Sequence, residues 1–85
     1  MKSFEYVIAD ELGIHSRPAG MIVKKAKEYE SGVTIRAGDR QADATRLFQV
    51  MGLAAKQGQS LTFEVSGPDE EKAAAELLAF LESHV

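Results

Sequence analysis

The spacing of hydrophobic and polar residues changes several times along the chain. Apolar and polar residues alternate over residues 4–9, 33–37 and 61–65, and this period of two predicts strands that bury one face. Over residues 17–29 the apolar positions instead recur every three or four residues, which predicts an amphipathic helix. Its apolar face comprises Ala19, Ile22, Val23, Ala26 and Tyr29.

Two shorter segments follow the second predicted strand. Residues 38–39 are Gly-Asp, which is typical of a tight turn, so residues 40–43 can return as a short strand. The dense apolar run over residues 47–53 fits either a strand or a helix. We favour a short helix, because residues 54–56 are good helix formers and Gly58 can end it.

Glycines also mark the ends of the two longer helices. Ser31 and Gly32 follow the first helical pattern, and we expect Gly32 to close it in a left-handed conformation. Gly67 and Pro68 end the strand at residues 61–65, and three acids then open the last helix. The apolar stripe of this last helix comprises Ala73, Ala74, Leu77, Leu78 and Leu81.

The predicted order is therefore strand, helix, strand, strand, helix, strand, helix. Four strands and helices that each carry a single apolar stripe predict a two-layer α+β sandwich with the helices on one face. No linker, repeat or low-complexity segment interrupts the 85 residues, so we interpret residues 1–85 as one domain.

Composition excludes several classes of function. The chain has no cysteine, so disulfides and thiol chemistry are excluded. No apolar run approaches the roughly 18 residues of a membrane span, and the first residues enter a strand pattern instead of a signal peptide. We therefore expect a soluble, cytoplasmic protein.

The formal net charge of -3 is unevenly distributed. The first helix is basic, with Arg17, Lys24, Lys25 and Lys27, whereas the last helix is acidic. These can be two ordinary solvated faces, or the basic helix can steer acidic partners toward its N-terminal end. With this overall balance we expect no binding of nucleic acid.

The residues at the start of the first helix are the strongest functional signal. Pro18 is well tolerated in a first helical turn, and Ser16 is a suitable capping residue. His15 is then expected at the positive end of the helix, beside free backbone N–H groups and the Arg17 guanidinium. An imidazole in such an anion site is placed to accept and hand on a phosphoryl group.

Other chemistry has weaker support. The chain has no glycine-rich nucleotide loop, so it is not expected to make a phosphohistidine from a nucleotide by itself. We interpret Asp10, Glu11, Asp39 and Asp43 as turn and solvent residues, since they form no recognisable acid–base pair. His84 is the second histidine, and we expect neither a metal site nor a cofactor.

The chain resembles HPr, the histidine-containing phosphocarrier family of the bacterial phosphotransferase system. The resemblance rests on residues 13–19, Gly-Ile-His-Ser-Arg-Pro-Ala, and extends through Gln57-Gly58 and the break at residues 67–70. It implies an open-faced β-sandwich, in which three helices cover one face of a four-stranded antiparallel sheet. It also implies that His15 accepts a phosphoryl group from phospho-enzyme I and passes it to sugar-specific enzyme IIA domains.

The resemblance assigns roles to other residues. Arg17 would neutralise phosphate charge, and the N–H groups of Ser16 and Arg17 would help to hold the phosphate. The short helix at residues 47–53 would lie beside the first helix and present apolar side chains to partners, while Val50 and Leu53 are expected in the core. The implied docking surface comprises Arg17, Met21, Lys24, Lys27, Leu47, Phe48 and Met51.

Arg46 departs from the pattern of many Gram-positive relatives, which carry a regulatory serine at this position. An arginine cannot be phosphorylated by the seryl kinase of those relatives, so the usual regulatory seryl site is absent. We therefore expect a monomeric carrier that is itself a substrate of other enzymes and not an enzyme. The alternative is an HPr-like paralogue that acts as a regulatory docking module for other proteins, or in a nitrogen-type phosphorelay.

Overall fold

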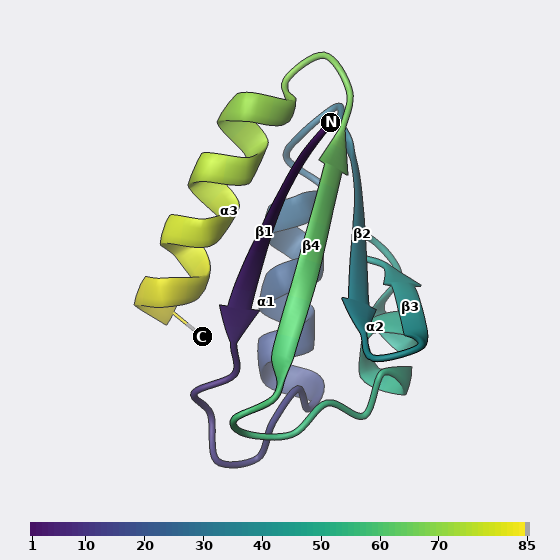
Figure 1. The fold of residues 1–85 in the computed structure, drawn as a ribbon, viewed down its shortest axis with the longest axis vertical. Helices are drawn as coiled ribbons and strands as arrows, with labels where there is room; N and C mark the ends of the chain where they lie inside the picture. Colours follow the sequence, from purple (N-terminus) through teal and green to yellow (C-terminus); the bar gives the residue numbers. More distant parts are fainter. Residues whose placement is uncertain (85) are drawn as a thin grey trace.

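Four strands form one antiparallel sheet in the computed structural model, which describes residues 1–84 (Figure 1). They are β1 (Lys2–Val7), β2 (Gly32–Ala37), β3 (Arg40–Asp43) and β4 (Ser60–Ser66), and they lie in the order β1-β4-β2-β3. β4 pairs with β1 on one side and with β2 on the other, with Phe63 opposite both Phe4 and Ile35. The sheet is open, as the sequence resemblance implied.

Three helices complete the order β-α-β-β-α-β-α. They are α1 (Ser16–Ala26), α2 (Leu47–Gly52) and α3 (Glu70–His84). α1 lies behind the middle of the sheet, α3 runs along the β1 side, and α2 lies beside β3 (Figure 1). No helix among residues 1–84 is long and apolar enough to cross a membrane.

One face of the sheet carries the core. Leu61, Phe63 and Val65 of β4 are buried, whereas the intervening Thr62 and Glu64 are partly exposed. The same alternation in β1 and β2 turns their apolar side chains toward the helices. Phe4 stacks on Phe63 with ring centroids 5.0 Å apart. Burial of each such side chain stabilises the fold by about 1.5–3 kcal/mol, so this face fixes where the helices pack.

Two helices end earlier than the sequence predicted. α1 ends at Ala26 instead of residue 29, and Gly32 begins β2 without a left-handed conformation. Tyr29 lies beyond the helix but still packs against the core, and its hydroxyl donates to Glu76 at 2.6 Å. Beyond Lys27 the chain continues as a tighter turn, in which the N–H groups of Glu28 and Tyr29 donate to the carbonyls of Lys25 and Ala26. The contact with Glu76 adds a link from this turn to α3.

α2 is also shorter than predicted. It ends at Gly52, and Ala54 lies in the left-handed region with a φ of 52°. The predicted continuation through residues 54–56 is therefore wrong. The physical reason is that the Ala55 carbonyl turns to accept the Ile14 N–H at 2.9 Å, a contact that a continued helix would not allow.

Candidate functional site

The segment that holds His15 is bound on both sides by the loop between α2 and β4. The Ile14 N–H donates to the Ala55 carbonyl at 2.9 Å, and the Gln57 side-chain amide donates to the Ala9 carbonyl at 3.0 Å. Figure 1 shows these two loops side by side at one end of the sheet. The histidine segment is therefore held by hydrogen bonds to residues that are far from it in sequence.

Gly13 is required by this close approach. Its φ is +70°, and an added Cβ would collide with the Ala55 carbonyl oxygen and the Lys56 Cα. A side chain at this position would therefore be strained both by the conformation and by the space. The Gly13 N–H also donates to the Asp10 carbonyl at 2.9 Å, which closes a tight turn just before His15.

His15 itself occupies the N-cap position of α1. Its backbone is extended, with φ -101° and ψ -170°, and its carbonyl accepts the Ala19 N–H at 3.0 Å. The expectation that Ser16 caps the helix is wrong, because Ser16 is already the first helical residue and its predecessor has the extended backbone of a cap. Pro18 lies in the first turn, as predicted, and is buried.

The N-terminal end of α1 is open to an anion. No side chain caps it, and the first turn contains no acidic residue. The first turn of a helix has no intrahelical acceptor for its leading N–H groups, so those of Ser16 and Arg17 are available to a ligand. The side chains of Ser16 and Arg17 are exposed, and the His15 imidazole is 32% exposed. A phosphoryl group can therefore reach the ring from solvent.

Sequence reasoning missed Asp10. We interpreted it as a turn residue, but its Oδ2 lies 3.5 Å from His15 Nε2 and its Oδ1 accepts the Leu12 N–H at 2.8 Å. The Leu12 hydrogen bond, assisted by His15 and Arg17, lowers the pKa of the Asp10 carboxyl group. An acid just before a glycine turn was the only signal, because the separation of five residues does not by itself predict contact.

The apolar residues of α2 are distributed as expected. Val50 and Leu53 are buried, whereas Leu47 is 37% exposed, Phe48 is 84% exposed and Met51 is partly buried against the core. An exposed phenylalanine has no role in packing the core, so it is available to a protein partner. The exposure predicted for α2 is confirmed, and its role in docking stays a prediction.

The basic residues of α1 fall into two groups. Lys24 and Lys27 are exposed and Met21 is partly exposed, so all three can be reached by a partner. Lys25, by contrast, pairs with Glu28 at 3.2 Å and lies 5.7 Å from the centroids of the Tyr29 and Phe80 rings. Lys25 therefore contributes to the contact between α1 and α3 more than to a free basic surface.

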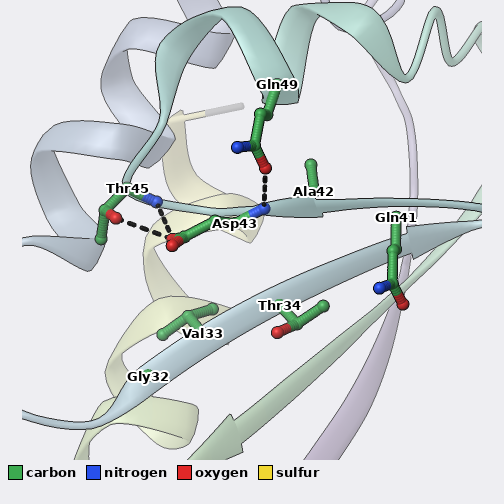
Figure 2. Close-up of a pocket in the computed structure, with 8 residues that line it drawn as sticks. All are labelled: Gly32, Val33, Thr34, Gln41, Ala42, Asp43, Thr45 and Gln49. Carbon is green, nitrogen blue, oxygen red and sulfur yellow. Dashed lines mark hydrogen bonds between the residues drawn. The ribbon is translucent and has the colours of Figure 1, made fainter.

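α2 is tied to the edge of the sheet by the side chains around an open groove (Figure 2). Gln49 of α2 accepts the Asp43 N–H at 2.9 Å, and Asp43 Oδ1 accepts both the N–H and the hydroxyl of Thr45. The two Thr45 hydrogen bonds lower the pKa of the Asp43 carboxyl group. The groove contains none of the predicted site residues, and its polar groups serve to orient α2.

Other candidate chemistry is not assembled. Among residues 1–84, no three histidine or acidic side chains come together as a metal site. His84 lies at the end of α3 and stacks on Phe80 at 4.7 Å between ring centroids. Arg46 is the exposed N-cap residue of α2 and supplies no side-chain cap.

Comparison with known proteins now gives the family. Residues 2–83 match the family described as PTS HPr component phosphorylation site. The chain belongs to the HPr family. A phosphocarrier protein HPr of Lysinibacillus sphaericus is 40% identical over 95% of this chain and 92% of its own. The HPr of Haemophilus influenzae is 38% identical over 95% of each chain. HPr proteins are phosphocarriers of the phosphotransferase system, and thus carriers rather than catalysts.

The fold comparison agrees with the sequence comparison. A crystal structure of an HPr from Thermoanaerobacter tengcongensis superposes with a TM-score of 0.91 at 29% identity. It covers 98% of this chain and 93% of the other. The family thus accounts for the whole order of strands and helices, and His15 lies in residues 13–19, on which the sequence resemblance rests.

Proposed function

We propose that this protein carries a phosphoryl group on His15, which it accepts from phosphorylated enzyme I and passes to enzyme IIA domains for sugar uptake. The observation that carries the proposal is the position of His15 at the uncapped, acid-free N-terminus of α1. The Ser16 and Arg17 N–H groups and the Arg17 guanidinium are the donors that suit a phosphate dianion there.

The shallow site suits a carrier. A phosphoryl group in transit must be held firmly enough to survive diffusion and must remain accessible to the next acceptor. The His15 ring is about one-third exposed, and each partner can complete the site from the solvent side. Phosphoryl transfer depends mainly on positioning and charge stabilisation, so two docked proteins can share the machinery.

Docking is proposed to involve the surface formed by α1 and α2. Its apolar part on α2 is Leu47, Phe48 and Met51, and its basic residues are Arg17, Lys24 and Lys27, which belong to α1 and its C-cap together with Met21. An apolar centre with charged margins fits an acidic partner surface. Methionine side chains adapt to different shapes, which helps one surface to serve several partners. We propose that the protein works as a cytoplasmic monomer.

The decisive experiment is intact-protein mass spectrometry after incubation with phosphoenolpyruvate and a bacterial enzyme I. The expected result is one acid-labile phosphoryl group on the wild-type protein and on His84→Ala, and none on His15→Ala. The His84→Ala variant controls for the loss of a histidine elsewhere.

The same variants address the alternative function. Failure of the folded wild-type protein to gain the group would contradict the assignment to sugar transport. If His15→Ala then kept its affinity for a regulatory protein, the docking-module function would replace the carrier function. A nitrogen-type relay would instead be indicated by phosphorylation from a specialised enzyme I only.

A further inference from the structure

The loop after β1 presents a carboxylate to the histidine that the proposed function uses. Asp10 is held from two directions, because its Oδ1 accepts the Leu12 N–H at 2.8 Å and its carbonyl accepts the Gly13 N–H at 2.9 Å. The other carboxylate oxygen, Oδ2, lies 3.5 Å from Nε2 of His15. The two side chains are 28% and 32% exposed, so solvent only partly screens the contact.

The chemistry of the two groups favours one position for the proton of the neutral ring. An ionised carboxylate is an acceptor only, and the Leu12 N–H favours the ionised form of Asp10. A neutral imidazole has one N–H and one lone pair, and the hydrogen bond made by one nitrogen sets the state of the other. With Asp10 beside Nε2, the proton belongs on Nε2 and the lone pair is left on Nδ1.

We propose that Asp10 is a positioning residue that favours the Nε2–H tautomer of neutral His15, in which the Nδ1 lone pair is free to accept the phosphoryl group. This inference rests on the proposed phosphocarrier function and deepens it. Asp10 touches neither phosphate nor donor in this arrangement, and it acts only through the imidazole ring.

The transfer step balances without any proton movement. The Nδ1 lone pair forms the new bond to phosphorus, while the bond from phosphorus to the donor protein's atom breaks and its electron pair leaves with the donor. The imidazole keeps its proton on Nε2 and gains positive charge, which the Asp10 carboxylate offsets. In the onward step a lone pair of the acceptor protein forms the new bond to phosphorus, while the nitrogen–phosphorus bond breaks and its electron pair returns to Nδ1.

The charges around the ring are consistent with this division of roles. Arg17 is close enough to Asp10 to help to lower the pKa of its carboxyl group, and Arg17 belongs to the first turn of α1. A carboxylate that met the phosphoryl group directly would repel it. Contact with Nε2 instead places the imidazole ring between the carboxylate and a group on Nδ1.

The test compares Asp10→Asn with Glu11→Gln. Both variants remove one negative charge from the same loop. Glu11, however, is exposed and forms no hydrogen bond with His15 within residues 1–84. The asparagine oxygen can still accept the Leu12 N–H, so the turn is retained. Its amide group, however, can donate to an unprotonated Nε2, which would favour the other tautomer.

The direct measurement is the pair of imidazole ¹⁵N chemical shifts of His15, recorded where the ring is neutral. We expect a predominant Nε2–H form in the wild type and Glu11→Gln, and a larger Nδ1–H population in Asp10→Asn. The rate of phosphorylation by phospho-enzyme I should fall about ten-fold in Asp10→Asn alone, as for other hydrogen-bond partners that orient a functional histidine. Amide spectra report whether each variant is folded.

Two results would overturn the inference in distinguishable ways. An unchanged tautomer population in folded Asp10→Asn would refute the positioning role, even if His15 is phosphorylated normally. A tautomer that responds to Asp10 in a chain that takes no phosphoryl group would instead refute the carrier function, and with it any role of Asp10 in transfer.

Discussion

The N-terminal ends of α1 and α3 are built in opposite ways. α1 begins without a side-chain cap or an acidic residue, whereas α3 has Glu70 and Glu71 in its first turn. Ahead of α3, Asp69 accepts the Ser31 N–H at 2.9 Å and the Ser31 hydroxyl at 2.5 Å. The Glu70 carboxylate accepts the Gly67 N–H at 3.2 Å and pairs with the Met1 amino group at 2.6 Å.

This difference explains why only one of the two ends suits a phosphate. Both helices have the positive end of their dipole at the N-terminus, but in α3 the carboxylates of the first turn neutralise it. The first turn of α1 contains Arg17 and no acidic residue, so no carboxylate of the helix itself occupies its N-terminal N–H groups. An anion site at a helix terminus therefore requires a first turn without acidic or capping side chains as well as the histidine.

The largest effect is expected when an acidic residue is introduced into the first turn of α1, which then resembles the first turn of α3. We expect Arg17→Glu to slow phosphorylation of His15 about a hundred-fold, because a charge-assisted contact is lost and a like charge faces the incoming group. Transfer from phosphoenolpyruvate through enzyme I can be followed by intact mass over time. Lys72→Glu makes the same charge change in α3 and should keep a near-normal rate, and an equal loss there would show that net charge alone matters.

The complementary change removes the acid that precedes α3. Asp69→Asn weakens the contacts with Ser31 and should lower the melting temperature by several degrees at neutral pH. The Ser31 hydroxyl and the neighbouring N–H groups hold the pKa of Asp69 below its usual value. The stability that Asp69 provides is thus present above its unfolded pKa, near 4, and is lost as pH falls through the lower folded value.

Thermal melting of the wild type and Asp69→Asn between pH 7 and pH 2 checks this sign. The two proteins should differ most at neutral pH and converge in acid, while phosphorylation of His15 at neutral pH stays intact. A difference that grew toward low pH would contradict the assignment of the stabilising group to ionised Asp69.

The smallest expected effect concerns α2, which begins at the cationic cap residue Arg46 and has no side-chain cap. A serine there can accept an N–H of the first turn and removes a positive charge from the positive end of the helix. Arg46→Ser should therefore raise the free energy of unfolding by about 0.5–1 kcal/mol. Urea denaturation of Arg46→Ser and Arg46→Ala measures the capping contribution, because both variants lose the positive charge but only serine can cap the helix. Equal stability of the two variants would exclude that contribution.

The order of elements was predictable from periodicity because most of the core is a simple alternation. The buried positions of β2 and β4 are those that the period of two selects, and the face of α1 that packs on the sheet is the one predicted up to Ala26. The errors occur where the chain leaves a regular element. Gly32 enters a strand and Ala54 adopts a positive φ, because backbone hydrogen bonds from distant segments decide those conformations.

The candidate site divides in the same way. Residues 15–18 by themselves determine a histidine at the start of a helix with an arginine beside it, since proline restricts where the helix can begin and the helix supplies the dipole. Only the tertiary structure brings Asp10 to Nε2 of His15, because the turn between them packs against the Ala55–Lys56 backbone, where Gly13 leaves room for it and Ile14 donates to Ala55. Local backbone preferences depend on neighbouring residues and can be predicted from the sequence. A contact between two loops depends instead on how the strands of the whole sheet are paired.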